Sequence, residues 1–285
     1  MPIQPLNTLV ATKVLSIKTT KGSGPFEVVC NHDEIYFAKT TDVKAEPFTE
    51  LISEVVGNYF ASIWGLQTAE PCLIKIPKEV VDAYIKEIGQ PLPVRYAQTK
   101  FNEILFFGVK SVANNIEIES YMNGITTKKE FNLFNNPLDL IKIGALDFWL
   151  GNKDRKPDNP NILLSSDFNK FNFIPIDHAA CFGYSNQLKS LKSSHLHIED
   201  ANNILSSGLA VSILKYSKRA ELLPLIDSIT ESIASSIEHS DEIFSQVPSS
   251  WGFSKKAKEN IIFVLSEKER NLNISKMFIR FKPKK

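Results

Sequence analysis

The sequence is poor in cysteine and has no long apolar run, and both shortages narrow the kind of protein that it can encode. Its 285 residues include three cysteines, Cys30, Cys72 and Cys181, which lie far apart and form no CxxC pair. Such cysteines favour reduced thiols over a disulfide framework or a cysteine metal cluster. No apolar run approaches the roughly 20 residues that span a bilayer, and the N-terminus lacks the apolar segment of a signal peptide. We therefore expect a cytoplasmic protein with no membrane partner.

An excess of charge of either sign is also missing. The 33 Lys and Arg residues against 32 Asp and Glu residues leave a formal net charge of +1 at pH 7. This balance makes direct binding to nucleic acid or to an anionic membrane surface an unlikely main role. The apolar fraction of 43% is that of an ordinary globular protein. A chain of this length suits one large domain or two lobes that share a cleft.

The first hundred residues show the alternation of strands, interrupted by one helical pattern. Apolar positions of residues 46–65 recur every three or four residues, which is typical of an amphipathic helix, and Gly65 is suited to end it. A turn with two glycines, "KGSGP", separates the first two strands, and residues 79–89 also have a helical pattern. The strands are predicted at residues 10–20, 26–30, 34–40, 71–76 and 103–112.

From about residue 135 the pattern becomes helical, apart from one hairpin in which "SDFNK" joins strands at residues 161–166 and 170–182. We therefore expect an α+β fold with a small β-rich lobe that carries one helix, residues 1–112, and a larger, mainly helical lobe, residues 113–285. Clefts between such layers are where ligands commonly bind. The later helices are predicted at residues 137–152, 198–217, 220–237, 240–247 and 254–272.

One loop between two apolar segments is unusually rich in carboxylates and carboxamides. The fourteen residues "GNKDRKPDNPNILL", 151–164, hold two Asp, three Asn and two Pro. Asp154 precedes Asn159 by five positions, and Asp177 follows an apolar strand in "IPIDHAACF". A loop and a strand end that deliver Asp and Asn oxygens together form the kind of oxygen-rich site that Mg²⁺ prefers. We therefore expect these side chains to share one site.

Two charged residues of the first lobe are candidates for the same site. Lys39 shares a strand face with Phe37, and an inward-facing lysine needs a partner. Glu54, at the border of the apolar side of the predicted helix, is a suitable one. The glycines of "KGSGP" would let backbone N–H groups approach phosphates. Each feature alone has a plainer explanation, because solvated lysines, solvated glutamates and hairpin glycines are common.

The order of these features resembles the protein-kinase-like superfamily: a glycine turn, a strand Lys, a helix Glu, a D-x(4)-N loop and a strand-borne Asp. The HRD and DFG triplets of eukaryotic protein kinases are missing, and "NKDR" and "IDHAAC" stand in their places. The loop and the "IDH" strand resemble instead the HipA-like kinases and, more distantly, the phosphatidylinositol kinases. The resemblance covers about residues 10–275 and implies a bilobal, protein-kinase-like fold.

The resemblance also implies a function: an ATP- and Mg²⁺-dependent kinase that phosphorylates Ser or Thr of a protein, itself included. Lys39 would then contact the α- and β-phosphates and be held by Glu54. Asp154 would orient or deprotonate the attacking hydroxyl. The backbone N–H groups that cover the phosphates would be those of Gly22, Ser23 and Gly24.

The metal ligands implied by the resemblance are Asp177 and one asparagine. The five-residue spacing favours Asn159, whereas the "NILL" continuation favours Asn161. We expect His178 to be structural, since an adjacent strand residue points to the other face. Arg155 would either form a structural ion pair or bind a phosphorylated segment, and Asp147 would brace the loop.

Other function classes stay open at this point. The alternatives within the same fold are a non-catalytic, pseudokinase-like nucleotide-binding module and a kinase for a lipid or small molecule. A metal-dependent hydrolase built on Asp154, Asp177 and His178 would leave Lys39 and Glu54 without a role. A toxin-like regulator would reach DNA only through a partner. Serines in "SLKSSHLH" and "SSGLA", beyond the metal strand, are candidates for self-phosphorylation.

Overall fold

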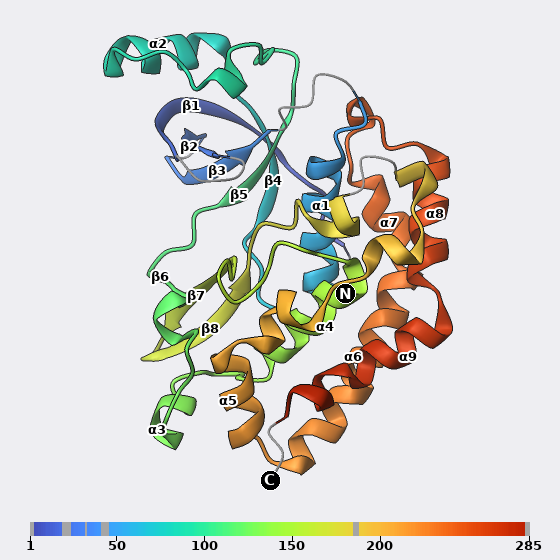
Figure 1. Cartoon of the computed structure of the whole chain (residues 1–285). Helices are drawn as coiled ribbons and strands as arrows, with labels where there is room; N and C mark the ends of the chain where they lie inside the picture. Colours follow the sequence, from blue (N-terminus) through green and yellow to red (C-terminus); the bar gives the residue numbers. More distant parts are fainter. Residues whose placement is uncertain (1–2, 19–23, 32, 41–45, 185–187, 283–285) are drawn as a thin grey trace.

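The computed structural model describes residues 3–18, 24–31, 33–40, 46–184 and 188–282 (Figure 1). Strands dominate up to residue 110, and helices dominate from residue 118 onward. The predicted α+β class is therefore confirmed. The division into two lobes after residue 112 stays a prediction. No helix in these described ranges is long and apolar enough to cross a membrane.

Five strands of the first part close into a barrel with the order β1-β2-β3-β5-β4. All of the pairs are antiparallel except β1 with β4, which run parallel and close the ring. The strands are β1 (Thr8–Ile17), β2 (Phe26–Cys30), β3 (Ile35–Lys39), β4 (Pro71–Lys75) and β5 (Phe106–Lys110). Each was predicted from its sequence, with ends that differ by a few residues.

The alternation of side chains across β3 decides which face Lys39 occupies. Tyr36 and Ala38 are buried inside the barrel, and Phe37 and Lys39 are on the opposite face. Lys39 pairs with Phe107 of β5 in the register of the two strands. The predicted shared face of Phe37 and Lys39 is confirmed, since both line one cleft.

The barrel interior is filled by aromatic side chains and covered by α2 (Lys78–Ile88), which lies above the barrel in Figure 1. Phe26 contacts the rings of Tyr96 and Phe101, with centroid distances of 4.7 and 5.8 Å. These two residues come from the segment after α2, so that segment closes one side of the barrel. Cys30 and Cys72 are buried there as free thiols.

Helix α1 (Thr49–Ile63) lies between the barrel and the helices that follow (Figure 1). It was predicted as an amphipathic helix, yet twelve of its fifteen residues are buried. The reason is that it contacts β5 on one side and α4, α6 and α7 on others. Its polar residues Glu54 and Asn58 are buried and line a cleft. Gly65 follows the helix with φ of +71°, the left-handed conformation expected of a glycine at a helix end.

The helical part is assembled around α1 and α4. Its helices are α3 (Lys128–Phe131), α4 (Asp139–Leu150), α5 (Gly208–Tyr216), α6 (Arg219–Glu238), α7 (Ser240–Ser245), α8 (Lys255–Leu265) and α9 (Lys268–Lys276). The helix predicted for residues 198–217 is too long, because α5 begins at Gly208. The Asn203 carboxamide accepts the N–H of Leu205 and donates to the Gly144 carbonyl, which favours short 3-10 turns there over an α-helix.

A three-stranded sheet, β6-β7-β8, lies beside α4. It consists of β6 (Asn115–Glu117), β7 (Ile162–Asp167) and β8 (Lys170–Pro175). The predicted "SDFNK" turn is confirmed: Phe168 and Asn169, with φ of +44° and +67°, form the two-residue turn between β7 and β8. Ile162 pairs with Pro175, so the residues before β7 and after β8 lie side by side.

We expect Trp251→Ala to lower the free energy of unfolding by about 3–5 kcal/mol. The Trp251 indole is fully buried, its Nε1 donates to the Leu105 carbonyl at 3.2 Å, and its own carbonyl accepts the Phe48 N–H. The Trp251 side chain therefore joins the C-terminal part of the chain to the segment before β5. The Trp251 main chain joins it to the start of α1. Urea unfolding measures the loss. Phe168→Ala is the control, because Phe168 is 96% exposed, and an equal loss in both variants would contradict the expectation.

Candidate active site

A cleft of about 790 Å³ collects the described candidate residues from both parts of the chain. Its lining includes Lys39, Glu54, Asp154, Asn159, Asn161 and Asp177. Gly22 and Ser23 lie outside the described residues. Gly24 is described and precedes Pro25, which lines the cleft. The structure therefore brings together six side chains that span 138 positions of the sequence, from 39 to 177.

The Lys39 ammonium lies between two carboxylates. Its Nζ is 2.6 Å from Glu54 Oε1 and 3.0 Å from Asp177 Oδ1. The three residues come from β3, from α1 and from the segment directly after β8. Glu54 is also held by the backbone N–H of His178, which donates to Oε2 at 2.9 Å. The predicted Lys39–Glu54 ion pair is therefore present, and Lys39 forms a second ion pair with Asp177.

Two carboxylates that share one ammonium cannot be equally stabilised in their charged forms. Burial raises the pKa of Glu54 to about 7, although Lys39 opposes the shift. Burial also disfavours the charge of Asp177, but there the Lys39 ammonium prevails and lowers the pKa to about 2. For Lys39, burial works against the two carboxylates, which raise its pKa above the ordinary value. Asp177 thus stays ionised and is 28% exposed to the cleft.

The loop before β7 is folded around Asp154. The Asp154 N–H donates to Asn152 Oδ1 at 3.2 Å, which fixes the loop entry. Asn159 Nδ2 donates to the Asp154 carbonyl, and Asn161 Nδ2 donates to the Asp154 carboxylate, both at 3.1 Å. Each asparagine therefore donates a hydrogen bond to Asp154 through its carboxamide nitrogen. A carboxamide has one oxygen acceptor in addition, so each can still offer Oδ1 to a ligand.

Arg155 connects this loop to α4 and to the segment after β8. The guanidinium is fully buried and forms an ion pair with Asp147 of α4. Its Nε donates to the Asn161 carbonyl at 3.3 Å, and an Nη atom donates to the Ile176 carbonyl at 2.7 Å. Of the two interpretations given by the sequence, the structural ion pair is the one observed, with Asp147 as its partner. Arg155 thereby links α4, the loop and the strand end that precedes Asp177.

His178 is 2% exposed and lies against Gly57 of α1. Burial lowers its pKa well below the ordinary value, so the imidazole is neutral. Asp177, just before it, has φ of +59°, a left-handed conformation that Asp tolerates better than most residues. The buried ring and the backbone bond to Glu54 agree with the structural role predicted for His178.

The geometry can be compared with known proteins. The family model described as HipA-like kinase matches residues 13–278. The chain belongs to the HipA-like kinase family. Among solved structures, the fold is similar to the proinflammatory kinase CtkA of Helicobacter pylori, with a TM-score of 0.51, 14% identity, and 97% of this chain and 99% of that chain covered. A search of curated proteins finds no match.

A second solved structure is HipA of Shewanella oneidensis MR-1, from a toxin–antitoxin complex with HipB and operator DNA. The TM-score is 0.48 at 10% identity, and the match covers 94% of this chain and 66% of that chain. Membership of the HipA-like kinase family supports a kinase function and implies the use of ATP.

Among the polar residues that line the cleft of this HipA-like kinase but were not singled out in the sequence are Lys156 and Asn58. Lys156, two positions after Asp154, is 3.5 Å from Asp158 and partly exposed. Asn58 is buried one helical turn after Glu54 and donates to the Ala69 carbonyl at 3.2 Å. The signal for Asn58 is its i+4 spacing from Glu54 on an otherwise apolar helix. Lys156 is a basic residue inside an acidic loop, which is a weak signal.

The residues that could hold a metal are few. The described residues contain no cluster of three or more His, Cys, Asp or Glu side chains suited to a metal ion. Mg²⁺ needs only one or two protein carboxylates or carbonyl oxygens when phosphate oxygens and water complete its shell. The ionised Asp177 and one asparagine Oδ1 fit that requirement, so the donor set suits Mg²⁺ bound together with a nucleotide.

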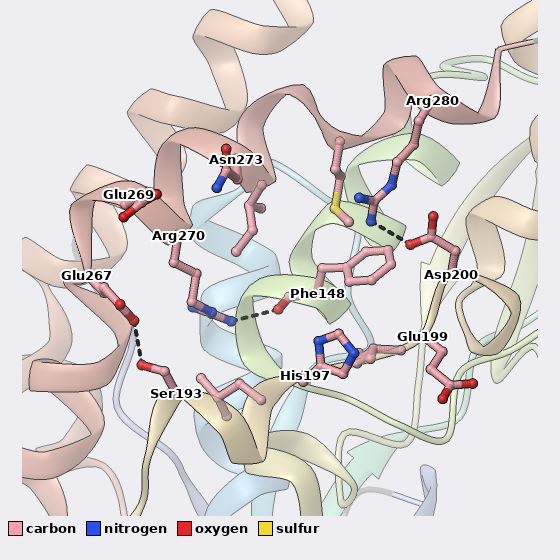
Figure 2. Close-up of a pocket in the computed structure, with 14 residues that line it drawn as sticks. Phe148, Ser193, His197, Glu199, Asp200, Glu267, Glu269, Arg270, Asn273 and Arg280 are labelled. Atoms are coloured by element: carbon pink, nitrogen blue, oxygen red, sulfur yellow. Dashed lines mark hydrogen bonds and ion pairs between the residues drawn. The ribbon is translucent and has the colours of Figure 1, made fainter.

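A second cavity of about 650 Å³ lies beside Phe148 of α4, and its lining holds none of the predicted catalytic, nucleotide-binding or metal-binding residues (Figure 2). Arg270 lines it, and its guanidinium donates to the Phe148 carbonyl at 2.7 Å and to the Trp149 carbonyl. These carbonyls are at the C-terminal end of α4, where no intrahelical donor reaches them. Arg270 therefore caps the helix that leads into the Asp154 loop.

We expect Arg155→Met to lower the free energy of unfolding by about 3–5 kcal/mol near neutral pH, since Asp147 would be left buried without its counter-charge. Burial already raises the pKa of Asp147 to about 7 with Arg155 present. A carboxyl with a raised folded-state pKa contributes stability at low pH that is lost as pH rises through that pKa. Without Arg155 the pKa rises further, so the deficit of the variant should grow as pH rises above about 7, where Asp147 is ionised in the wild type but resists ionisation in the variant.

Urea unfolding at several pH values checks this expectation. Arg280→Met is the matched control, because Arg280 pairs with Asp200 and both are about half exposed. An exposed pair contributes about 1 kcal/mol or less. A deficit of Arg155→Met that shrinks with rising pH would contradict the assignment of Asp147 as a buried carboxylate.

Proposed function

We propose that the protein is an ATP- and Mg²⁺-dependent kinase that transfers the γ-phosphoryl group to a Ser or Thr hydroxyl of a protein. The observation that carries the proposal is the Lys39–Glu54–Asp177 cluster, which shares a cleft with the Asp154 loop. Residues 1–112 and 113–285 would be the two lobes, since the cleft is lined by residues from both ranges. Family membership supports the kinase part of the proposal.

The apolar side of the cleft is suited to the adenine base. Phe107 and Val109 of β5 line it together with Leu163 of β7 and Ile176. Pro25 and Phe37 line it as well. A flat aromatic base would be buried among these side chains, close to residues 110–112, which connect β5 to the second part of the chain. The nucleotide phosphates would then extend toward Lys39.

Lys39 would contact the phosphates as a point charge, because its ammonium is already oriented by Glu54. Mg²⁺ would be held by Asp177 and Asn159, and when bound it would offset the charge that develops on the transferred group. Asn159 is favoured over Asn161 because the Asn161 carboxamide donates to the Asp154 carboxylate itself. Asn161 would therefore orient Asp154. Lys156, which lines the same cleft, would contact the transferred phosphoryl group.

Asp154 would receive the attacking hydroxyl of the substrate. Its carboxylate is fixed by Asn161, and its backbone is fixed by Asn152 and Asn159. A carboxylate held in this way can orient the hydroxyl in line with the γ-phosphoryl group and accept its proton. Catalysis would depend mainly on positioning and on electrostatic stabilisation.

A protein is the favoured substrate, since the near-neutral chain gives no reason for attraction to an anionic lipid surface. For self-phosphorylation the two serine-rich stretches differ. Ser207 of "SSGLA" is buried and caps α5 through its side chain, which accepts the Ala210 N–H. Ser194 of "SLKSSHLH" is exposed. Self-phosphorylation would therefore occur in "SLKSSHLH" and not at Ser207.

The direct test is transfer of label from γ-³²P-ATP with Mg²⁺ to the protein itself or to proteins of a lysate. We expect Asp154→Asn and Asp177→Asn each to reduce transfer by a factor of at least about 100, since each removes a group that acts on the reacting atoms. Asp167→Asn, at an exposed aspartate of the β7–β8 hairpin, should leave the rate unchanged. Transfer that persists in both site variants would refute the proposal, and ATP binding without transfer would favour a pseudokinase.

The two asparagines should differ in their dependence on Mg²⁺. We expect Asn159→Ala to raise the Mg²⁺ concentration for half-maximal rate by about tenfold, because a metal ligand is lost. Asn161→Gly should instead lower kcat at saturating Mg²⁺. Glycine is used there because Asn161 has φ of +46°, which alanine disfavours. The opposite pattern in Mg²⁺ titrations would assign Asn161 as the ligand.

A further inference from the structure

Helix α1 packs against the segment that follows β8 at a glycine, Gly57. Gly57 lies three residues after Glu54, in the interior of α1, where glycine costs about 1 kcal/mol relative to alanine. A Cβ atom at this position would lie 2.5 Å from His178 Cβ, 2.7 Å from Cγ and 3.0 Å from Nδ1. Nonbonded carbon atoms are at their optimum at about 3.5–4.0 Å. No other side chain fits at Gly57 unless His178 or the helix moves.

His178 thus touches α1 in two ways. Its ring lies on Gly57, and its backbone N–H donates to Glu54 Oε2 at 2.9 Å. Because His178 directly follows Asp177, the distance from the helix to this residue also sets the distance from Glu54 to Asp177. Lys39 bridges those two carboxylates, so a change in the distance between Glu54 and Asp177 would break or lengthen one of its two ion pairs.

The helix itself is held at several other points. Asn58 Nδ2 donates to the Ala69 carbonyl at 3.2 Å, the Tyr59 hydroxyl to the Gln4 carbonyl at 2.6 Å, and Trp64 Nε1 to Ser236 Oγ at 3.2 Å. These bonds reach the barrel side, the N-terminal segment and α6. A helix fixed on three sides cannot retreat from a larger residue at position 57, so the segment Asp177–His178 would be displaced instead.

We propose that the Gly57–His178 contact is a positioning contact that sets the spacing between α1 and Asp177, and so assembles the Lys39–Glu54–Asp177 cluster. The proposal rests on the kinase function proposed above for its catalytic meaning, but its geometric content is independent of activity. His178 is accordingly a positioning residue, which acts through Glu54 and Asp177 and does not contact the reacting atoms.

The experiment compares Gly57→Ala with Gly144→Ala. Gly144 of α4 is equally crowded, since a Cβ there would lie 2.4 Å from Leu205 Cγ. Both variants should be destabilised by overpacking. Hydrogen exchange of the His178 amide, measured by NMR relative to amides of β2, should become at least about tenfold faster in Gly57→Ala. In Gly144→Ala it should stay within about twofold of the wild type.

A complementary exchange tests the steric origin of the effect. In the double variant Gly57→Ala with His178→Gly, the new methyl group occupies space vacated by the ring, so the residue-178 amide should exchange more slowly than in Gly57→Ala. If Gly57→Ala does not fold, His178→Ala replaces it, with exposed His197→Ala as its control. Loss of the ring should then speed exchange of the residue-178 amide at least about tenfold, without an effect in the control.

The outcomes separate the two proposals. Exchange in Gly57→Ala that equals that of Gly144→Ala would overturn the positioning contact, whatever the enzyme activity. Faster exchange in a protein whose wild type transfers no phosphoryl group would support the contact and refute the kinase. In an active enzyme we expect Gly57→Ala to lower kcat by at least about tenfold more than Gly144→Ala, since Asp177 would leave its position beside Lys39.

Discussion

The whole arrangement depends on one ammonium group shared by two carboxylates. Lys39, Glu54 and Asp177 come from a barrel strand, a central helix and a strand end, and they meet within 3.0 Å of one nitrogen atom. One ammonium faces two carboxyl groups, so the three groups carry a net charge of −1 when both carboxyl groups are ionised. Burial raises the pKa of Glu54, while the Lys39 ammonium keeps Asp177 ionised. The ionised Asp177 is therefore the carboxylate that faces the cleft beside Lys39.

Two arginines, Arg155 and Arg270, hold the segments next to this cluster in place. Arg155 uses its buried guanidinium to connect α4, the Asp154 loop and the residue before Asp177, and Arg270 caps the same end of α4. Both arginines donate to backbone carbonyls in the interior, Arg155 to those of Asn161 and Ile176 and Arg270 to those of Phe148 and Trp149. The conformation of the Asp154 loop is therefore held by the fold itself, which reduces the ordering that a ligand would have to induce.

Much of this was predictable from the sequence, for reasons that are local. The face of Lys39 follows from the two-residue period of β3, and the turn at Phe168 and Asn169 follows from a short polar break between apolar strands. Glu54 and Asp177 could be proposed because a charged residue at the edge of an apolar pattern needs a partner. Each of these inferences uses only neighbours within a few positions.

The features that were missed depend on contacts between distant segments. The parallel pairing of β1 with β4 and the three exposed residues of β6 have no local signal. The burial of twelve of the fifteen residues of α1 arises because helices that begin more than 70 positions after its end cover its second side. Gly57 looks in the sequence like a weak point of a helix, and only the position of His178, 121 residues later, gives it a purpose.

The closed barrel has one more consequence. In an open sheet, a strand that is displaced by a ligand can fray at its free edge and absorb the movement. Here β1 is bonded to β2 and β4, and β2 is bonded to β1 and β3, so neither has a free edge. A displacement of β1 or β2 would be transmitted to β3, because β1 is hydrogen-bonded to β2 and β2 is hydrogen-bonded to β3. The positions of β1 and β2, which lie on either side of residues 19–23, are therefore coupled to the position of Lys39 through main-chain hydrogen bonds, with no side chain as intermediary.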